Sequence, residues 1–415
     1  MGTRSVNTIT ADIAIIGAGP AGSSCALSLK DSGVSVLLID KAYFPRDKIC
    51  GDALSGKVVS GLKSMIPDIR AKLTNFEEAR DAWGIRFFSP STHSLDVPFK
   101  RNPSLKKEES PSFVLPRYAF DHLLFSAVSS CPDIRVLQGH RLTHLTRTAA
   151  GWQLDTHQGR LQAKLLIDAS GATSLLARQT YPFKSSPKHL SVGLRQYIQG
   201  IEGCHEQGYL ELHYLPSVMP GYAWIFPMGN GKANVGIGML SSDLHKKEDT
   251  LDQIYEQFLM HPSICERMTQ ATPLERPKGW SLPFGSLKRK ISGDYYLMTG
   301  DAAGLIDPFT GEGIANAILS GKLAAQKAME CFQADDFSST FMESYDETLF
   351  SNIGAELKLS HQLQQVGRYP FLLNILIKKA ARNPAIQDLF TSMFEEIDIR
   401  KTLSKPSFYV NLLFK

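Results

Sequence analysis

The chain has 415 residues, of which 43% are hydrophobic, and its formal net charge at pH 7 is only +4. These values are typical of a globular protein with two or three domains, and no apolar run approaches the roughly 18 to 20 residues that a membrane span needs. No arginine-rich segment suggests nucleic-acid binding, and the six scattered cysteines indicate neither a disulfide framework nor a metal site.

The first predicted elements are a strand, a tight turn and a helix. The apolar run at 12–16 leads into Gly17-Ala18-Gly19-Pro20-Ala21-Gly22, whose glycines let the backbone approach a pyrophosphate at the N-terminus of the helix. A second strand at 34–39 ends in Asp40, where a carboxylate accepts hydrogen bonds from an adenosine ribose. This context predicts a dinucleotide site with contacts from Gly17, Gly19, Ala21, Gly22, Asp40 and Lys41.

The middle of the chain has mixed patterns. A strand-like, loop-rich stretch around 87–113 is followed by a predicted helix at 118–125 and by strands at 134–137, 142–146, 152–156 and 165–167. From 190 to 240, apolar and polar residues alternate between glycines, which predicts an antiparallel sheet that carries the substrate face.

A second group of motifs completes the predicted flavin site. The strand at 295–299 precedes Gly300-Asp301, and Asp301 is placed to bind ribityl hydroxyls. A helix predicted to begin near Gly311 directs its positive end at the flavin, which favours the reduced anion. The small-residue turn after Asp168 lets the backbone pass close to a cofactor. Arg117 is a candidate partner for a phosphate or for a flavin ring oxygen.

Because the two flavin motifs lie far apart, the cofactor domain must be discontinuous. We predict an α/β fold with a Rossmann-like FAD-binding domain, an inserted antiparallel-sheet substrate domain and a helical C-terminal extension. The FAD-binding domain comprises 1–75, 113–180 and 286–332, the substrate domain comprises 76–112 and 181–285, and the helical region comprises 333–415.

At these motifs the chain resembles the geranylgeranyl reductase family of FAD-dependent oxidoreductases, within the para-hydroxybenzoate hydroxylase-like group, over roughly residues 10–330. Lys48-Ile49-Cys50-Gly51-Asp52-Ala53 is similar to the family's KxCG segment beside the flavin. The resemblance implies FAD contacts from Gly22, Asp40, Cys50, Gly51, Ala53, Arg117, Leu142, Asp301, Gly313 and Ile314, to which the motifs add Asp168 and Gly311.

A further match is more discriminating. Tyr222-Ala223-Trp224-Ile225-Phe226-Pro227, followed by Val235-Gly236-Ile237-Gly238, is similar to the family's YxWxFP…VGxG motif, with Ile237 where Thr or Leu is usual. The resemblance implies a substrate cavity lined by Tyr222, Trp224, Phe226 and Pro227, although each ring alone could equally be core packing.

The implied activity is reduction of carbon–carbon double bonds in a prenyl, geranylgeranyl-type lipid or quinone-like substrate, with hydride from N5 of reduced FAD. The electron donor is NAD(P)H or a ferredoxin-like protein. The alternatives are a flavin monooxygenase or hydroxylase and a non-catalytic flavin-binding lipid carrier. A halogenase is disfavoured because the WxWxIP pattern is absent.

The proton donor is open at this stage. Cys50 is a candidate catalytic residue because it is expected to border flavin and substrate, although a lone cysteine is more often a small buried apolar residue. Tyr222, Tyr209 and His213 are further candidates by location.

The C-terminal region carries apolar residues at helical spacing, which usually pack on the protein's own core; they are Ile386, Leu389, Phe390, Met393, Phe394 and Ile397. Residues 371–379 and 408–415 combine apolar side chains with lysine, as interfacial segments do. Because no apolar run is long enough to span a membrane, we expect a cytoplasmic protein, and peripheral membrane contact through this region is the alternative. The oligomeric state is open.

Overall fold

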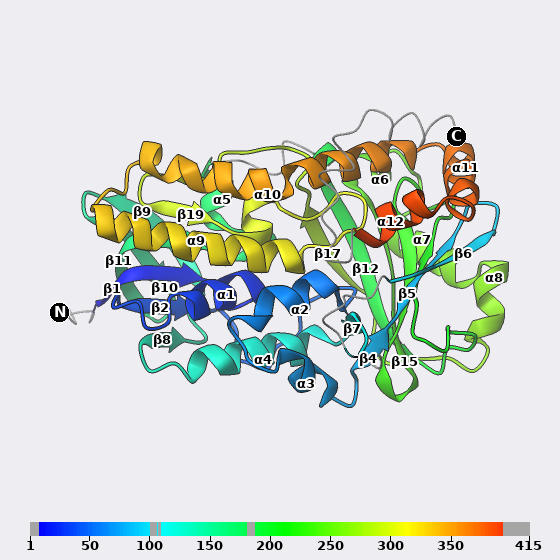
Figure 1. Cartoon of the computed structure of the whole chain (residues 1–415), viewed down its shortest axis with the longest axis horizontal. Helices are drawn as coiled ribbons and strands as arrows, with labels where there is room; N and C mark the ends of the chain where they lie inside the picture. The colour runs from blue at the N-terminus through cyan, green and yellow to red at the C-terminus, as the bar shows by residue number, and fades with distance from the viewer. Residues whose placement is uncertain (1–7, 100–105, 107–108, 181–186, 393–415) are drawn as a thin grey trace.

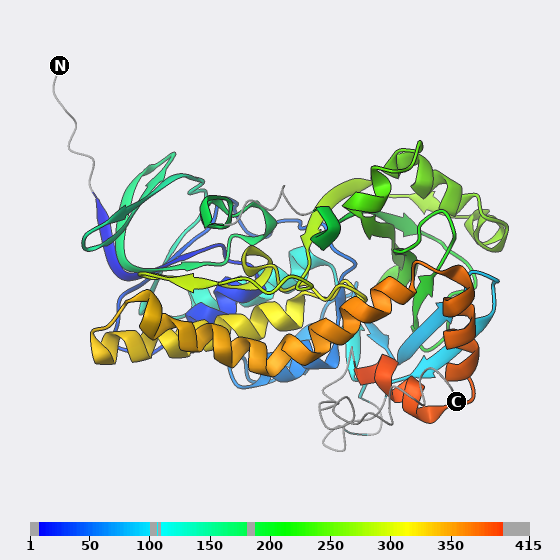
Figure 2. The ribbon, with the colours of Figure 1, turned by 90° about the horizontal axis from the view of Figure 1, so that it is seen from above.

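The computed structural model describes residues 8–99, 106, 109–180 and 187–392. Figures 1 and 2 show two large sheets, one towards each end of the molecule, with the long helix α10 (Ser339–Val366) running past both. Within these described residues each large sheet has eight strands, and a three-stranded sheet made of β3, β7 and β4 accompanies them. The predicted combination of a Rossmann-like unit, a second sheet and C-terminal helices is confirmed.

The first sheet is the Rossmann-like unit. Its strands follow the order β18-β19-β11-β1-β2-β8, and the pairs β19–β11, β11–β1, β1–β2 and β2–β8 are parallel. The second half of β1, at 13–16, and all of β2 are buried apolar runs, as expected for parallel strands that are covered on both faces. The bounds are β1 (Ile9–Ile16), β2 (Val36–Ile39), β8 (Ile134–Leu137), β9 (Leu142–Thr148), β10 (Gly151–Thr156), β11 (Gly159–Asp168), β18 (Ser292–Gly293) and β19 (Tyr296–Met298).

Two helices far apart in the sequence pack together beside this sheet. Helix α1 (Pro20–Ser28) follows the N-terminal glycine motif, and α9 (Ile314–Ala334) follows the motif at Gly300. They approach so closely that a Cβ added to Gly321 of α9 would lie 2.3 Å from the carbonyl oxygen of Ala21. This contact brings the two predicted halves of the flavin site to the same end of the first sheet.

The second sheet follows the order β16-β12-β15-β14-β13-β5-β6, with β17 also paired to β12. All of its pairs are antiparallel except β13–β5, which is parallel. The antiparallel prediction therefore misses one pair, because β5 comes from a distant segment and local alternation does not specify strand direction. The bounds are β5 (Gly84–Phe88), β6 (Ser94–Pro98), β12 (Leu190–Gln199), β13 (Leu210–His213), β14 (Tyr222–Pro227), β15 (Lys232–Leu240), β16 (Thr272–Pro273) and β17 (Lys278–Pro283).

Shorter elements connect these units. Helix α4 (Arg117–Ser129) contains the predicted helix at 118–125, and α9 begins at Ile314, three residues after the predicted start. The remaining bounds are β3 (Ala53–Leu54), β4 (Arg80–Ala82), β7 (Ser112–Val114), α2 (Gly56–Lys63), α3 (Ile69–Thr74), α5 (Leu175–Thr180), α6 (Ser241–Leu244), α7 (Leu251–Leu259) and α8 (Pro262–Cys265).

The chain continues beyond α10 with α11 (Pro370–Ala380) and α12 (Pro384–Ser392). Ile386 is buried in the same core cluster as Leu373 and Ile377, so this part of the predicted apolar stripe packs on the protein itself. Met393, Phe394, Ile397 and 408–415 lie outside the described residues, as do the side chains of Leu389 and Phe390. None of the helices in the described part of the chain is both long and apolar enough to cross a membrane.

Candidate active site

A cavity of about 490 Å³ lies where the two glycine motifs meet. It is called the larger cavity because a smaller one of about 130 Å³ adjoins it. Segments from both ends of the chain and from the second sheet line it. Twelve of the predicted cofactor residues contribute to its wall: Gly17, Gly19, Ala21, Asp40, Lys41, Cys50, Gly51, Arg117, Asp301, Gly311, Gly313 and Ile314. The structure thus brings together residues that the sequence separates by almost three hundred positions.

The wall of the larger cavity fits a dinucleotide. Gly17 has φ +100°, and a Cβ there would lie 2.4 Å from the carbonyl oxygen of Ala169. Gly19 caps α1, and no side chain of the described residues caps that helix, so its first N–H groups can bind a phosphate. The Asp40 carboxylate accepts one bond per oxygen, from the N–H groups of Ala18 and Ala42 at 2.8 Å, and keeps lone pairs for ribose hydroxyls.

Several predicted cofactor residues do not line the larger cavity. Gly22 is buried in α1, where a Cβ would lie 1.8 Å from the carbonyl oxygen of Gly17, so its role is close packing. Leu142 lies in β9 and packs against the core. The buried Asp168 carboxylate accepts bonds from Ser170 and Ser174 and so fixes the turn beneath the cavity. Ala53 lines a neighbouring cavity instead.

Arg117 reaches the larger cavity with its guanidinium already paired. Its Nε and Nη2 donate to the two oxygens of Asp121 at 2.7 and 2.8 Å, and Asp121 also pairs with Arg46 at 2.8 Å. Burial alone would lower the pKa of Arg117, but Asp121 and the neighbouring Cys50 raise it above the ordinary value. The guanidinium therefore stays charged. Asp121 holds it in place, so it is not an unpaired cation that extends towards a phosphate.

Sequence reasoning missed several charged and aromatic residues on the wall of the larger cavity. Lys48 sits 4.4 Å from the centre of the Trp280 ring, and burial lowers its pKa to about 8. Arg195 of β12 is buried and pairs with Asp47 at 2.8 Å and with Glu275. Lys48 is part of the KxCG segment and could have been inferred from it. Arg195 in β12 and Trp280 in β17 carry no local sequence pattern that places them at this cavity.

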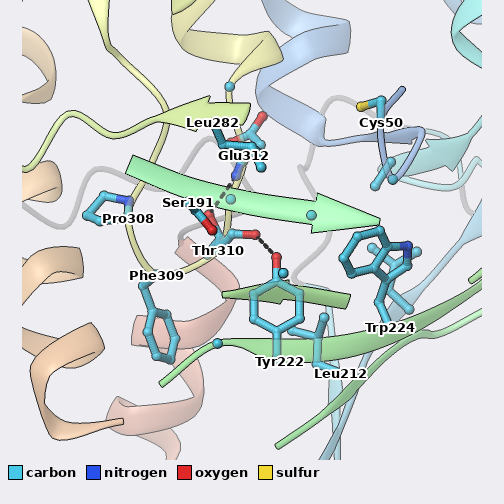
Figure 3. Close-up of a pocket in the computed structure, with 18 of the residues that line it drawn as sticks. Cys50, Ser191, Leu212, Tyr222, Trp224, Leu282, Pro308, Phe309, Thr310 and Glu312 are labelled. Carbon is cyan, nitrogen blue, oxygen red and sulfur yellow. Dashed lines mark hydrogen bonds between the residues drawn. The ribbon is translucent and has the colours of Figure 1, made fainter. Parts of the chain in front are cut away.

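A smaller cavity of about 130 Å³ adjoins the larger one (Figure 3). The rings of Tyr222, Trp224 and Phe226, from alternate positions of β14, line it on one side, while the predicted Pro227 does not. The two cavities share lining residues, namely Cys50, Gly51, Gly193, Trp224, Leu282, Gly311, Gly313 and Ile314. A ligand in the smaller cavity would therefore face a group in the larger one.

Glycines of β15 explain how the aromatic rings fit. Trp224 pairs with Gly236 and Tyr222 pairs with Gly238 across the antiparallel ladder. A Cβ on Gly236 would lie 2.2 Å from Cζ2 of Trp224, so the indole occupies the space that a side chain would fill. The aromatic and glycine halves of the motif thus form one structural unit, with the rings above and the bare backbone below.

A buried hydrogen-bond network anchors the segment that carries Cys50. The Trp224 indole N–H donates to Oδ1 of Asn234 at 2.8 Å, and the Asn234 amide donates to the Cys50 carbonyl oxygen at 2.8 Å and to Asp52 at 2.7 Å. The Tyr197 hydroxyl donates to the same Asp52 oxygen at 2.6 Å. Burial raises the pKa of Asp52 to about 6, against lowering by these donors and nearby arginines.

The other candidate proton donors differ in position. His213 is buried, contacts Glu211 at 3.1 Å and stacks on Phe88, and neither it nor Tyr209 lines either cavity. The Tyr222 hydroxyl faces the smaller cavity but donates to the Thr310 carbonyl oxygen. Cys50 lines both cavities.

Comparisons with known proteins agree with this architecture. Residues 12–193 match the family described as FAD dependent oxidoreductase, and residues 190–275 match the geranylgeranyl reductase catalytic domain. Digeranylgeranylglycerophospholipid reductase 2 of Methanosphaera stadtmanae is 31% identical over 360 residues, covering 84% of this chain and 86% of the relative. Menaquinone reductase of Mycolicibacterium smegmatis is 29% identical over 341 residues, covering 80% and 79%.

A solved structure shares the fold. The geranylgeranyl bacteriochlorophyll reductase-like protein of Thermoplasma acidophilum superimposes with a TM-score of 0.78 at 21% identity, covering 95% of this chain and 99% of that one. The arrangement of both sheets and the C-terminal helices is therefore that of a known flavoenzyme fold.

Proposed function

Since the chain belongs to the geranylgeranyl reductase family of FAD-dependent oxidoreductases, we propose that it reduces carbon–carbon double bonds in the prenyl chain of a lipid or quinone. The relatives named above are reductases whose names refer to a digeranylgeranyl lipid and to menaquinone, and both molecules carry prenyl chains. The same reaction class would serve either substrate.

The observation that carries this proposal is the junction of the two cavities. The smaller cavity is lined largely by apolar and aromatic residues, which suits a hydrocarbon chain, and it opens beside Cys50 and Gly313 onto the larger one. FAD in the larger cavity would be held by Asp40, by the N-terminus of α1 and by Asp301. Reduced FAD supplies a hydride when it is bound.

The chain's own residues then position the substrate and exclude water. The rings of Tyr222, Trp224 and Phe226 would hold an alkene at the junction, and their faces would stabilise positive charge that develops on it by about 0.5–2 kcal/mol per ring. Because an isolated alkene accepts hydride poorly, the protein must also supply a proton.

The experiment that tests this function measures product mass. Purified protein is reduced chemically without oxygen and mixed with a geranylgeranyl lipid or with menaquinone. We expect mass increments of two hydrogens and reoxidation of the flavin in step with them. Incorporation of an oxygen atom, or substrate-stimulated oxygen consumption in air, would instead identify a hydroxylase, and binding without turnover would identify a carrier.

A further inference from the structure

A carboxyl group faces the smaller cavity at its junction with the larger one. Glu312 lies between Gly311 and Gly313, which line both cavities, and its own side chain lines the smaller one (Figure 3). Cys50 and Trp224 border the same junction. The loop that carries Glu312 is fixed because the Asp307 N–H donates to the Glu312 carbonyl oxygen at 2.8 Å.

The hydrogen bonds of this carboxyl group are unevenly distributed. The Ser55 hydroxyl donates to Oε1 at 2.8 Å, and the Ala315 N–H approaches the same oxygen at 3.4 Å. Both contacts with described residues thus reach Oε1, which leaves Oε2 to carry a proton. Ser55 occupies the N-cap position of α2 without a capping bond from its side chain, so its hydroxyl is directed to Glu312 from a helix terminus.

The surroundings favour the protonated form of this group, so that a substantial fraction keeps its proton near neutral pH. Burial raises the pKa of Glu312 to about 7, with a further increase from Glu356 and Asp307, against lowering by Lys57 and Ser55. Lys57 of α2 and Glu356 of α10 form an ion pair at 2.5 Å behind the carboxyl, and both are partly exposed. Lys57 and Glu312 influence each other's pKa, so this partly exposed pair lies near the buried carboxyl.

Two other acidic groups that line the smaller cavity, Tyr222 and Asp52, are committed elsewhere. The Tyr222 hydroxyl donates to the Thr310 carbonyl oxygen, and burial raises its pKa above the ordinary value. The Asp52 carboxyl accepts bonds from Tyr197, Asn234 and the Arg117 N–H. Glu312 differs from Tyr222 and Asp52 because it combines an available carboxyl oxygen with a position at the junction.

We propose that Glu312 is the proton donor for alkene reduction, an inference that rests on the proposed function. The alkene receives a hydride and its electron pair from reduced FAD at one carbon and a proton from Glu312 at the other. Its π bond breaks, two C–H bonds form, FAD is oxidised and Glu312 becomes a carboxylate. Water restores the proton by way of the Lys57–Glu356 side.

The test compares E312Q, E312D and the matched control E343Q, since Glu343 is exposed on α10, far along the helix from Glu356. Reduced wild-type protein is mixed with a geranylgeranyl lipid at pH 6, and flavin reoxidation is followed without oxygen. We expect E312Q to slow reoxidation by about 10²- to 10⁴-fold at unchanged FAD content, as for loss of a general acid. E312D should recover part of the rate, and E343Q should match wild type.

A second measurement does not depend on turnover. Infrared difference spectra of the flavin-free protein between pH 5 and pH 9 should show a protonated carboxyl band that titrates near pH 7, is absent in E312Q and is shifted in E312D, while the Asp52 band that titrates near pH 6 persists in both variants. If E312Q does not fold, E312D provides the test: a shifted carboxyl band together with a reduced reoxidation rate supports the role of Glu312, and wild-type values for both refute it.

The outcomes separate the two proposals. Wild-type protein that leaves every prenyl substrate unchanged refutes the proposed function. Wild-type turnover combined with an E312Q rate within about threefold of it, or with a titrating band unaltered by substitution at Glu312, refutes the role of Glu312 alone.

Discussion

Trp224 shows how single residues define the junction of the two cavities. Its ring lies against the bare backbone of Gly236, and its N–H is fixed by Asn234, which also holds the Cys50 carbonyl oxygen. The ring centres of Tyr222 and Phe226 lie 6.1 and 6.2 Å away. A shift of the indole would therefore move both the substrate wall and the segment that carries Cys50.

Substitution of Trp224 should separate substrate reduction from flavin binding. We expect Trp224→Ala to lower reduction of the prenyl substrate at least tenfold while FAD content and reduction by dithionite remain nearly unchanged, because the side chain forms the shared wall between the cavities. Trp224→Phe keeps an aromatic wall but removes the donor to Asn234, so its loss should be intermediate. Parallel loss of flavin in Trp224→Ala would mean that the three rings are core packing.

At the level of elements, the pairing of α1 with α9 unites the two glycine motifs. Small residues at the crossing, including Ala21 and Gly321, allow the backbones to approach closely. The N-terminal ends of both helices point towards the larger cavity, where Gly19 and Gly313 occupy the cap positions. Their dipoles therefore add at a site that is suited to a negatively charged cofactor.

Two identical substitutions in helices should have opposite effects on stability. Alanine normally stabilises an exposed helix by up to about 1 kcal/mol relative to glycine. We expect Gly354→Ala in α10 to raise the free energy of unfolding in this way, because the new Cβ would meet only the Phe350 Cβ at 3.8 Å. In Gly321→Ala the new Cβ would lie 2.3 Å from the Ala21 carbonyl oxygen, so overpacking should lower the free energy of unfolding by about 1–3 kcal/mol.

Thermal and urea unfolding of both variants, with FAD at saturation, measures this difference. An increase in stability for Gly321→Ala would show that α1 and α9 are packed more loosely than described.

For the whole molecule, the α/β class and the order of its elements could be predicted because glycine turns, caps and apolar runs are local signals. The strands at 134–137 and 152–156 follow from such patterns. The parallel pair β5–β13 and the approach of Arg195 and Trp280 to the larger cavity could not, because they depend on contacts between distant segments. Leu142 was assigned by resemblance alone, and the residue bounds of the domains stay a prediction.

The assembly of one cofactor site from both ends of the chain has a measurable consequence. Asp40 and Asp301 line the same cavity from opposite ends of the sequence, so one bound FAD should contact both carboxylates. We expect Asp40→Ala and Asp301→Ala each to weaken FAD binding by about 1.5–3 kcal/mol, the range for hydrogen bonds to charged groups. The double variant should show a nearly additive loss, because the side chains contact different parts of the cofactor. Asp133→Ala, at an exposed position, is the control. FAD is titrated into the flavin-free variants and its retention during dialysis is followed by absorbance; if both aspartate variants keep full occupancy, the two ends of the chain do not share one flavin.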